Sequence, residues 1–235
     1  MNSAIGVWYT INMFVLLGNI SVRIGLYLFA GILAAFGITK ALPETVQIHV
    51  PFTTQAPRGV WSEPWQNACE EASILMIDTF YNGDMLTKEK AHDEILNIFA
   101  VKERAVGQSS DESMETIAAI INASDLIWQA RVVDNPKLAD MKAELSDQRP
   151  IIAPVYAPAL NNPHFRDGGP DYHVVVITGY DDTTSEFITH DPGTEQGENF
   201  RYGYVEFLSS IHDFLSVADY TAGPQRVLFT YPKND

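Results

Sequence analysis

The hydrophobic residues of this chain follow two different patterns. Residues 4–38 are apolar at most positions, and residues 24–38 (IGLYLFAGILAAFGI) form a run of fifteen without a charge, directly after Arg23. A run of about 15 apolar residues behind a positive charge is typical of a secretory signal, whereas a stretch longer than about 20 can anchor a protein in a bilayer. We therefore expect residues 1–41 to be a signal peptide or a membrane anchor, with residues 4–38 in contact with the membrane.

The remainder, residues 42–235, is expected to be a separate domain. Arg23 precedes the longest apolar run, and positively charged residues tend to stay on the cytoplasmic side of a membrane. This places the domain outside the cytoplasm, either secreted or tethered to the membrane.

Apolar residues between positions 68 and 145 recur at three- and four-residue spacing, which is the period of a helix. Asn67, with Glu70 three residues later, predicts an N-terminal capping box, and Asn82-Gly83 predicts the end of the same helix. The helices predicted in this way span residues 68–81, 87–99, 111–123 and 136–145.

The pattern changes from residue 150 to short β-branched and aromatic segments separated by turn signals. Strands are predicted at residues 46–52, 150–156, 173–180, 186–191 and 226–232. Helices followed by an antiparallel sheet define an α+β fold, because the alternating β and α units of a parallel sheet are absent from the sequence.

The composition of the chain limits the kinds of function that the protein can have. Hydrophobic residues make up 46% of the chain, which is enough for a sizeable core. The chain has 30 acidic and 15 basic residues, and all the acidic residues lie beyond residue 41. This balance excludes a nucleic-acid-binding surface, which needs clustered Lys and Arg. The single cysteine cannot close an intrachain disulfide, and no histidine lies at metal-ligand spacing, so we expect no metal and no cofactor.

The single cysteine, Cys69, follows the predicted cap at Asn67 and so occupies the first turn of a helix. Unsatisfied N–H groups and the helix dipole favour a thiolate there, which predicts a lowered pKa and a nucleophilic sulfur. Glu70 and Glu71 add negative charge beside it, and we expect them to point to other sides of the helix.

A general base for this nucleophile is predicted at His173, the first residue of the segment HVVVITGY after a loop. The next predicted strand, EFITHD, ends at Asp191. If the two strands form a hairpin, Asp191 lies beside His173, as the third member of a Cys-His-Asp triad requires.

Three segments carry a family resemblance: VPFTTQAPRGVWSEPWQNACEEASILM, HVVVITGYDD and FITHDPGTEQG. They resemble cysteine peptidase family thirty-nine and its broader papain-like relatives, which include peptidases that remove double-glycine leaders from bacteriocins. The resemblance implies a papain-like fold and a peptide or protein substrate. It also implies that Cys69 is the nucleophile, His173 the general base and later acid, and Asp191 the orienting carboxylate.

The same resemblance implies a glutamine whose amide helps to bind the oxyanion. Gln55 and Gln66 both fit this role, and Gln55 follows the VPF segment as the family's glutamine does. Cys69 is followed by Glu70 where the family usually has glycine.

We therefore expect an exported or membrane-tethered cysteine peptidase, a hydrolase acting on peptide bonds. Two alternatives use the same fold. One is a catalytically inactive papain-like domain that binds peptides or a surface partner, which the Glu70-Glu71 pair favours. The other is an amidase or acyltransferase that acts on cell-wall amides.

Overall fold

The computed structural model describes residues 41–108, 111–215 and 219–233. Residues 1–40 of the expected signal or anchor lie outside this part, so that expectation stays a prediction. Among the described residues, no helix combines the length and the apolar character needed to cross a bilayer.

The predicted helices in the first half of the domain are confirmed. They are α2 (Cys69–Asn82), α3 (Lys88–Val106), α4 (Met114–Ala123) and α5 (Leu138–Ser146). Helix α3 continues for two turns beyond the predicted end. A further short helix, α6 (Tyr204–Ser210), and the 3₁₀ turns η1 (Trp65–Asn67), η2 (Ala157–Leu160) and η3 (Arg166–Gly168) complete the helical elements that the structure describes.

The described strands form one seven-stranded antiparallel sheet in the order β2-β7-β3-β4-β5-β6, with β1 also paired to β4. The strands are β1 (Thr45–Gln47), β2 (Trp128–Asp134), β3 (Ile151–Val155), β4 (His173–Asp181), β5 (Glu186–His190), β6 (Phe200–Gly203) and β7 (Arg226–Pro232). Strands β2 and β6 were not predicted from the sequence, and the sheet is therefore wider than expected.

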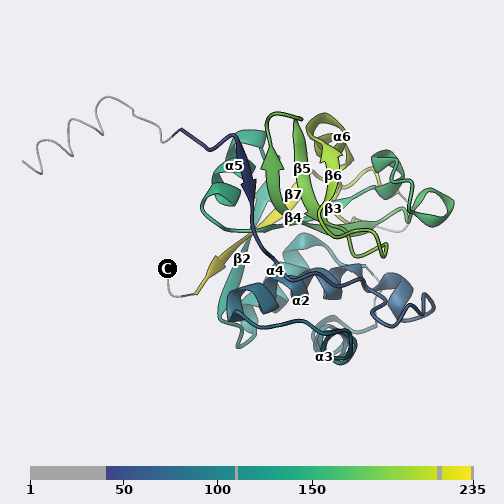
Figure 1. The fold of residues 1–235 in the computed structure, drawn as a ribbon. Coiled ribbons are helices and arrows are strands. Elements are labelled where there is room, and N and C mark those ends of the chain that lie inside the picture. The colour runs from purple at the N-terminus through teal and green to yellow at the C-terminus, as the bar shows by residue number, and fades with distance from the viewer. Residues whose placement is uncertain (1–40, 109–110, 216–218, 234–235) are drawn as a thin grey trace, which may run out of the picture. The chain divides into compact units, whose positions relative to one another are not determined.

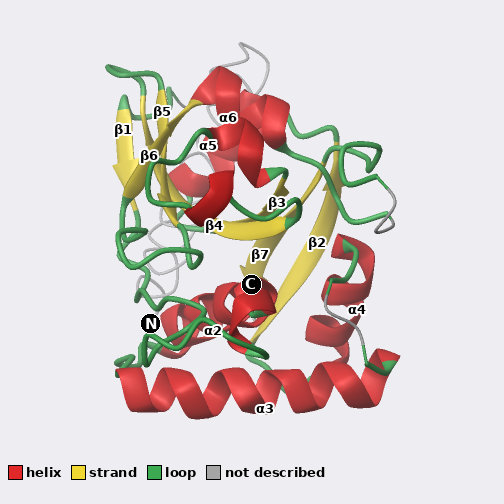
Figure 2. Ribbon diagram, turned by 90° about the vertical axis from the view of Figure 1, so that its right-hand side faces the viewer, coloured by secondary structure: helices red, strands yellow, loops and turns green. Residues whose placement is uncertain are grey.

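Helices cover both faces of this sheet (Figure 1). Helix α2 packs against β4, and α4 packs against β2 and β7 on the same side, whereas α5 and α6 lie on the opposite side. Figure 2 shows α3 beneath α2, on the side of α2 that faces away from the sheet. Helix α2 is thus enclosed between α3 and the sheet, which explains why most of its residues are buried.

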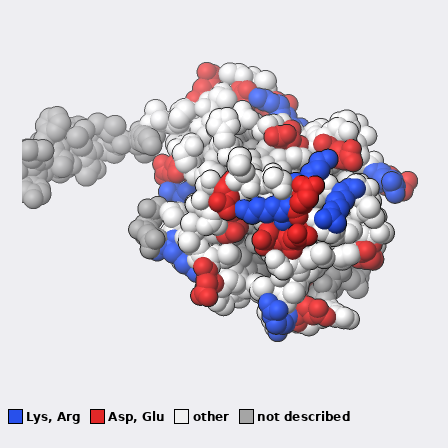
Figure 3. Space-filling view, turned by 60° about the horizontal axis from the view of Figure 1, so that its bottom comes forward, with Lys and Arg blue, Asp and Glu red and all other residues white. Residues whose placement is uncertain are grey.

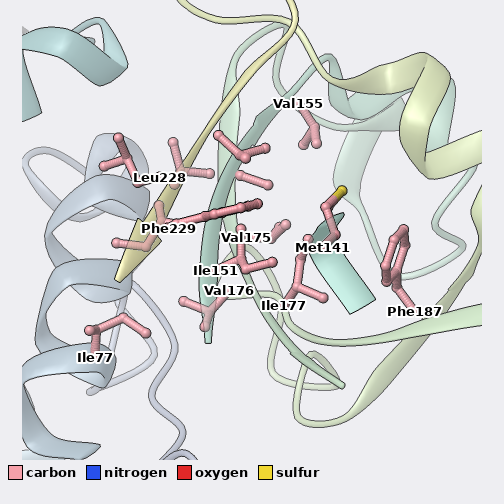
Figure 4. Packing of buried hydrophobic residues seen from close by; sticks show 14 of the residues in the cluster. Ile77, Met141, Ile151, Val155, Val175, Val176, Ile177, Phe187, Leu228 and Phe229 are labelled. Carbon is pink, nitrogen blue, oxygen red and sulfur yellow. The ribbon is translucent and has the colours of Figure 1, made fainter. Parts of the chain in front are cut away.

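The main core consists of apolar side chains from the sheet and from the helices on both of its faces (Figure 4). Ile77 of α2 lies on one side of the sheet, and Met141 of α5 lies on the other with Phe187 of β5. Strand β4 is buried over almost its whole length, so its side chains contribute to the core on both faces. This buried central strand carries His173 at its first residue.

The start of α2 differs from the predicted capping box. Asn67 lies in the turn η1, and its side-chain amide donates to Glu63 Oε1 at 2.8 Å instead of capping the helix. The residue before the helix is Ala68, which has no capping side chain, and Glu70 is buried. The predicted cap is therefore wrong, whereas the predicted end is confirmed at Gly83, whose positive φ of 68° suits glycine.

Strand β1 brings the N-terminal part of the domain to the middle of the sheet. A side chain at Gly179 of β4 would collide with the Val46 carbonyl of β1, so glycine allows the two backbones to approach. The chain then continues from Ile48, whose N–H donates to Thr178 O at 2.7 Å, to Gln55, whose N–H donates to Pro192 O at 2.9 Å. These contacts place Gln55 beside the residues that follow β5.

Candidate active site

His173 and Asp191 form a buried, hydrogen-bonded pair. His173 begins β4 and Asp191 directly follows β5, and the antiparallel pairing of these strands places the two residues side by side. The His173 Nε2 and Asp191 Oδ1 atoms are 2.7 Å apart, and the two residues are 1% and 0% exposed. The hairpin prediction that brought these two residues together is confirmed.

Asp191 is held as a carboxylate by several donors. Oδ1 also accepts the Gly193 N–H at 2.9 Å, and Oδ2 accepts from the Tyr202 hydroxyl at 2.6 Å and from Asn162 Nδ2 at 3.4 Å. Burial alone would raise the pKa of Asp191, but the neighbouring His173 and these hydrogen bonds outweigh burial, so its pKa lies below the usual value. Because an ionised carboxylate only accepts, the proton on the shared bond belongs to Nε2 of His173, and Nδ1 is left as the basic nitrogen.

Cys69 is the first residue of α2 and is 4% exposed. The beginning of α2 packs against the beginning of β4, where the Ser73 hydroxyl donates to Val174 O at 3.4 Å. The Val174 backbone is close enough to the Cys69 sulfur to act on the pKa of the thiol. The thiol therefore lies against the residue that follows His173.

The pKa of Cys69 is raised well above its usual value, which contradicts the prediction from its helix position. Burial is the largest cause, and the negative charges of Glu70, Glu71 and Asp111 add to it. The Val174 backbone opposes this rise in pKa but does not cancel it. Desolvation and nearby carboxylates thus exceed the favourable effect of the helix N-terminus, and the resting thiol is neutral.

The sequence predicts that Glu70 and Glu71 point away from the side of the helix that carries Cys69, and in the structure both side chains bind one lysine of α3. Lys102 Nζ of α3 lies 2.8 Å from Glu70 Oε2 and 2.6 Å from Glu71 Oε1, and all three side chains are buried. Burial raises the pKa of Glu70 to about 8 despite the opposing charge of Lys102. The two carboxylates raise the pKa of Lys102. The cluster links α3 to the residues directly after Cys69.

The main chain of Glu112 connects the two sides of the site. Its N–H donates to Glu70 Oε1 at 2.7 Å, and its carbonyl accepts from the Tyr172 hydroxyl at 2.9 Å. Glu70 follows Cys69 and Tyr172 precedes His173 in the chain. One residue therefore fixes the neighbours of both the thiol and the imidazole.

The structure separates the two candidate glutamines. Gln55 is buried, and its Nε2 donates to the carbonyls of Trp65 and Gln66 at 3.0 and 2.8 Å, in the turn η1 that leads to Cys69. Among the described residues, Gln55 Oε1 is buried without a hydrogen-bond partner. Gln66 is exposed, and its own amide donates to Glu63 Oε1.

A cavity of about 410 Å³ opens beside the His173-Asp191 pair. Its lining includes Gln55, Trp61, Phe165, Arg166, Gly193 and Glu195. Phe165 meets the His173 ring edge to face with centroids 5.5 Å apart. A Cβ at Gly193 would lie 2.8 Å from Cε1 and 2.9 Å from Nε2 of that ring, so glycine keeps this side of the imidazole free of a side chain.

His190 precedes Asp191, and its side chain is buried. Its Nε2 is 2.8 Å from the Val50 carbonyl, and its Nδ1 accepts the Asn199 N–H at 3.2 Å. Both ring nitrogens are used by the backbone. His190 therefore holds the segment that leads to Gln55 against the end of β5.

The fold and this arrangement define a papain-like cysteine peptidase, with a cysteine at the start of a helix that packs against an antiparallel sheet carrying a histidine and an aspartate. Residues 47–213 match the model of the Peptidase_C39 like family. The chain belongs to this family of cysteine peptidases, as the three sequence segments predicted.

Two solved structures share the fold at low sequence identity. One is a protein from Bacillus anthracis assigned as a C39-like peptidase, with a TM-score of 0.51, 14% identity, and coverage of 80% of this chain and 98% of that one. The other is xylellain, a cysteine protease from Xylella fastidiosa, with a TM-score of 0.51, 14% identity, and coverage of 80% and 86%. No curated protein sequence gives a significant match.

Proposed function

We propose that this protein hydrolyses peptide bonds through a triad of Cys69, His173 and Asp191. The observation that carries the proposal is the buried His173-Asp191 pair at 2.7 Å, with the Cys69 thiol against the residue that follows His173. Membership of the C39-like family supports a peptide or protein substrate.

The chemistry begins from a neutral thiol. As the Cys69 sulfur attacks the carbonyl carbon, its proton moves to His173 Nδ1 and the carbonyl π electrons move to oxygen. When the oxyanion collapses, the C–N bond breaks, and the imidazolium returns the proton to the leaving amine. Water then attacks the thioester while His173 takes its proton, and cleavage of the C–S bond restores the thiol.

Asp191 makes this proton transfer possible by keeping the second proton of His173 on Nε2 and by stabilising the imidazolium. The oxyanion is expected to bind the N–H of Cys69, in the first turn of α2 where N–H groups have no partner within the helix. Gln55 supplies the second donor, which requires its amide to turn from the η1 carbonyls toward the substrate.

The cavity beside His173 is suited to bind the amine side of the substrate, which is the first product to leave. The leaving amine must lie within reach of the imidazole that protonates it. Phe165 packs against this ring, a side chain at Gly193 would collide with it, and both residues line the cavity. The residues that follow the cleaved bond therefore occupy the cavity of about 410 Å³.

The experiment that tests the triad combines turnover with labelling of the thiol. Cys69→Ser is expected to abolish hydrolysis of an unfolded polypeptide, and Asp191→Ala to lower kcat by roughly 10,000-fold. Because Cys69 is the only cysteine in the sequence, iodoacetamide reports on it alone. His173→Ala is expected to slow this alkylation, and His164→Ala, which changes a histidine that lines the neighbouring cavity, is the control.

Equal alkylation rates in the wild type and His173→Ala would show that the thiol and imidazole do not act together. Hydrolysis of peptidoglycan fragments but not of polypeptides would assign the triad to cell-wall amides instead. The raised pKa of Cys69 and the buried Glu70-Glu71 pair favour one other candidate, an inactive domain that binds peptides. Tight peptide binding that survives Cys69→Ser, without turnover in the wild type, would establish that candidate.

We also propose that residues 1–41 export the domain or tether it, so that it acts outside the cytoplasm. The support is the charge-free run of residues 24–38 behind Arg23. Protease added to intact cells is expected to digest the domain if it is tethered, and the culture medium to contain it if it is released. Protection from protease together with absence from the medium would contradict export.

A further inference from the structure

The second oxygen of Asp191, which does not face His173, has its own buried partners. Tyr202 Oη donates to Asp191 Oδ2 at 2.6 Å, and Asn162 Nδ2 lies 2.7 Å from Tyr202 Oη and 3.4 Å from Asp191 Oδ2. Tyr202 is 2% exposed and Asn162 is 5% exposed. Neither residue belongs to the three segments that resemble the family.

The direction of every hydrogen bond in this network follows from the donors. The His164 N–H donates to Asn162 Oδ1 at 2.9 Å, which leaves the Asn162 amide nitrogen to donate to Tyr202. The Tyr202 oxygen accepts that bond, so its single proton is directed to Asp191. The hydrogen bonds thus all point the same way: the His164 N–H donates to Asn162, Asn162 donates to Tyr202, and Tyr202 donates to the Asp191 carboxylate.

Three separate segments provide this network. Asp191 follows β5, Tyr202 lies in the neighbouring strand β6, and Asn162 lies in the loop after η2. Fixing Oδ2 from two directions also fixes the rotation of the carboxylate about its Cβ–Cγ bond. Oδ1 is then kept on His173 Nε2.

We propose that Tyr202, oriented by Asn162, is a positioning residue of the triad, which holds Asp191 in the rotamer that keeps the His173 proton on Nε2. This inference rests on the proposed peptidase function. It predicts that the Tyr202 hydroxyl contributes to turnover although it touches neither substrate nor reacting atoms.

The chain offers a closely matched control for Tyr202→Phe. Tyr204, two residues further on, also donates its hydroxyl to a carboxylate, Asp182 Oδ1, at 2.8 Å. Tyr204→Phe therefore removes the same kind of hydrogen bond away from the triad. We expect Tyr202→Phe to lower kcat by about 10-fold or more without raising KM, and Tyr204→Phe to leave kcat within about 2-fold of the wild type.

A second readout does not depend on turnover. In the wild type and in Tyr204→Phe, the His173 Nε2 proton is expected to give a slowly exchanging NMR signal, because it is buried and bonded to Asp191. In Tyr202→Phe this signal is expected to be lost or broadened. Asn162→Ala is expected to give a smaller loss of kcat in the same direction, because it leaves the Tyr202 hydroxyl in place without its orienting donor.

The two proposals fail in different ways. Absence of Cys69-dependent turnover in the wild type contradicts the peptidase, and the NMR comparison then decides the role of Tyr202 alone. A kcat and an Nε2 proton signal in Tyr202→Phe equal to those in Tyr204→Phe would overturn the inference. Loss of the signal in Tyr202→Phe with its retention in Tyr204→Phe supports it.

Discussion

Cys69 and Asp191 are both buried acids, yet their pKa values are shifted in opposite directions. Burial is the largest cause in each case and raises both values. At Asp191 the neighbouring His173 and several hydrogen-bond donors reverse the effect, whereas at Cys69 the adjacent carboxylates reinforce it. The site therefore keeps a carboxylate ionised and a thiol protonated.

This contrast leads to a prediction for Glu70→Gln. Removing one negative charge next to the sulfur stabilises the thiolate, so alkylation of Cys69 is expected to rise at a lower pH than in the wild type. The measurement is the iodoacetamide rate as a function of pH, with the exposed Glu89→Gln on α3 as control. An unchanged profile in Glu70→Gln would show that the carboxylate does not act on the thiol.

The two glutamines lead to a second prediction. Gln55→Ala is expected to lower kcat by roughly 100-fold or more, because it removes the proposed oxyanion donor. Gln66→Ala, which removes an exposed amide bonded to Glu63, is expected to change kcat by less than about 3-fold. Steady-state kinetics on one peptide substrate compare the two, and the reverse order of effects would assign the role to Gln66.

At the scale of elements, the sequence predicted those segments whose periodicity is unbroken. Helix α2 and the strands β3, β4, β5 and β7 fall where the apolar pattern places them. Helix α3 continues to Val106 through a charged stretch in which apolar residues no longer recur at helical spacing. In this stretch the buried position is occupied by Lys102, which binds the buried Glu70 and Glu71.

The missed strands had weaker signals. In β2, apolar and polar residues alternate at Trp128, Ala130 and Val132, so a strand pattern is present. The strand was missed because it lies between two predicted helices in a part of the chain where helical spacing dominates. Strand β6 has only four residues, FRYG, which is too few to show alternation. Because Tyr202 lies in this short strand, the apolar pattern of the sequence did not reveal it as a partner of Asp191. The hairpin that joins His173 and Asp191 was predicted because both of its strands have a clear pattern.

The link between α2 and α3 gives a prediction at this scale. Lys102→Met leaves two buried carboxylates without their cation, and we expect it to lower the free energy of unfolding by about 3–5 kcal/mol. Lys90→Met, which breaks a partly exposed pair with Asp84, is expected to cost less than about 1 kcal/mol. Denaturant titration of both variants measures the difference, and equal small losses would show that the cluster does not stabilise the domain.

For the molecule as a whole, acidic and basic side chains lie next to each other on the face shown in Figure 3, although acidic residues outnumber basic ones by 30 to 15. The pH dependence of stability is therefore expected to come from buried groups more than from this face. Asp213 is one such group. Its Oδ1 accepts the N–H of Met114, at the start of α4, and of Phe214, both at 2.8 Å.

Burial raises the pKa of Asp213 from 3.8 to about 6. Between these values the folded protein holds a proton that the unfolded chain has lost, so this group's contribution to stability falls as the pH rises from about 4 to about 6. Asp213→Asn keeps the acceptor oxygen and removes the titration. Denaturant midpoints measured across this range are expected to decline less with pH in Asp213→Asn than in the wild type or in the exposed Asp93→Asn, and parallel curves would contradict this assignment.

Gly193 touches the imidazole, and one added methyl group there would lie 2.8 Å from His173 Cε1. Gly193→Ala is therefore expected to abolish turnover by displacing the ring, while the thermal midpoint stays within a few degrees of the wild type because the core is untouched. Assays of turnover and thermal unfolding on the same preparation check this, and full activity in Gly193→Ala would show that the ring can move without loss.

The consequence reaches beyond this chain. A protein of this family could keep its cysteine, histidine and aspartate and still have lost hydrolysis through a side chain at the position of Gly193. A comparison that separates active peptidases from inactive family members by the presence of the cysteine, the histidine and the aspartate alone would count such a protein as active. Such a comparison should therefore also require glycine at the position of Gly193.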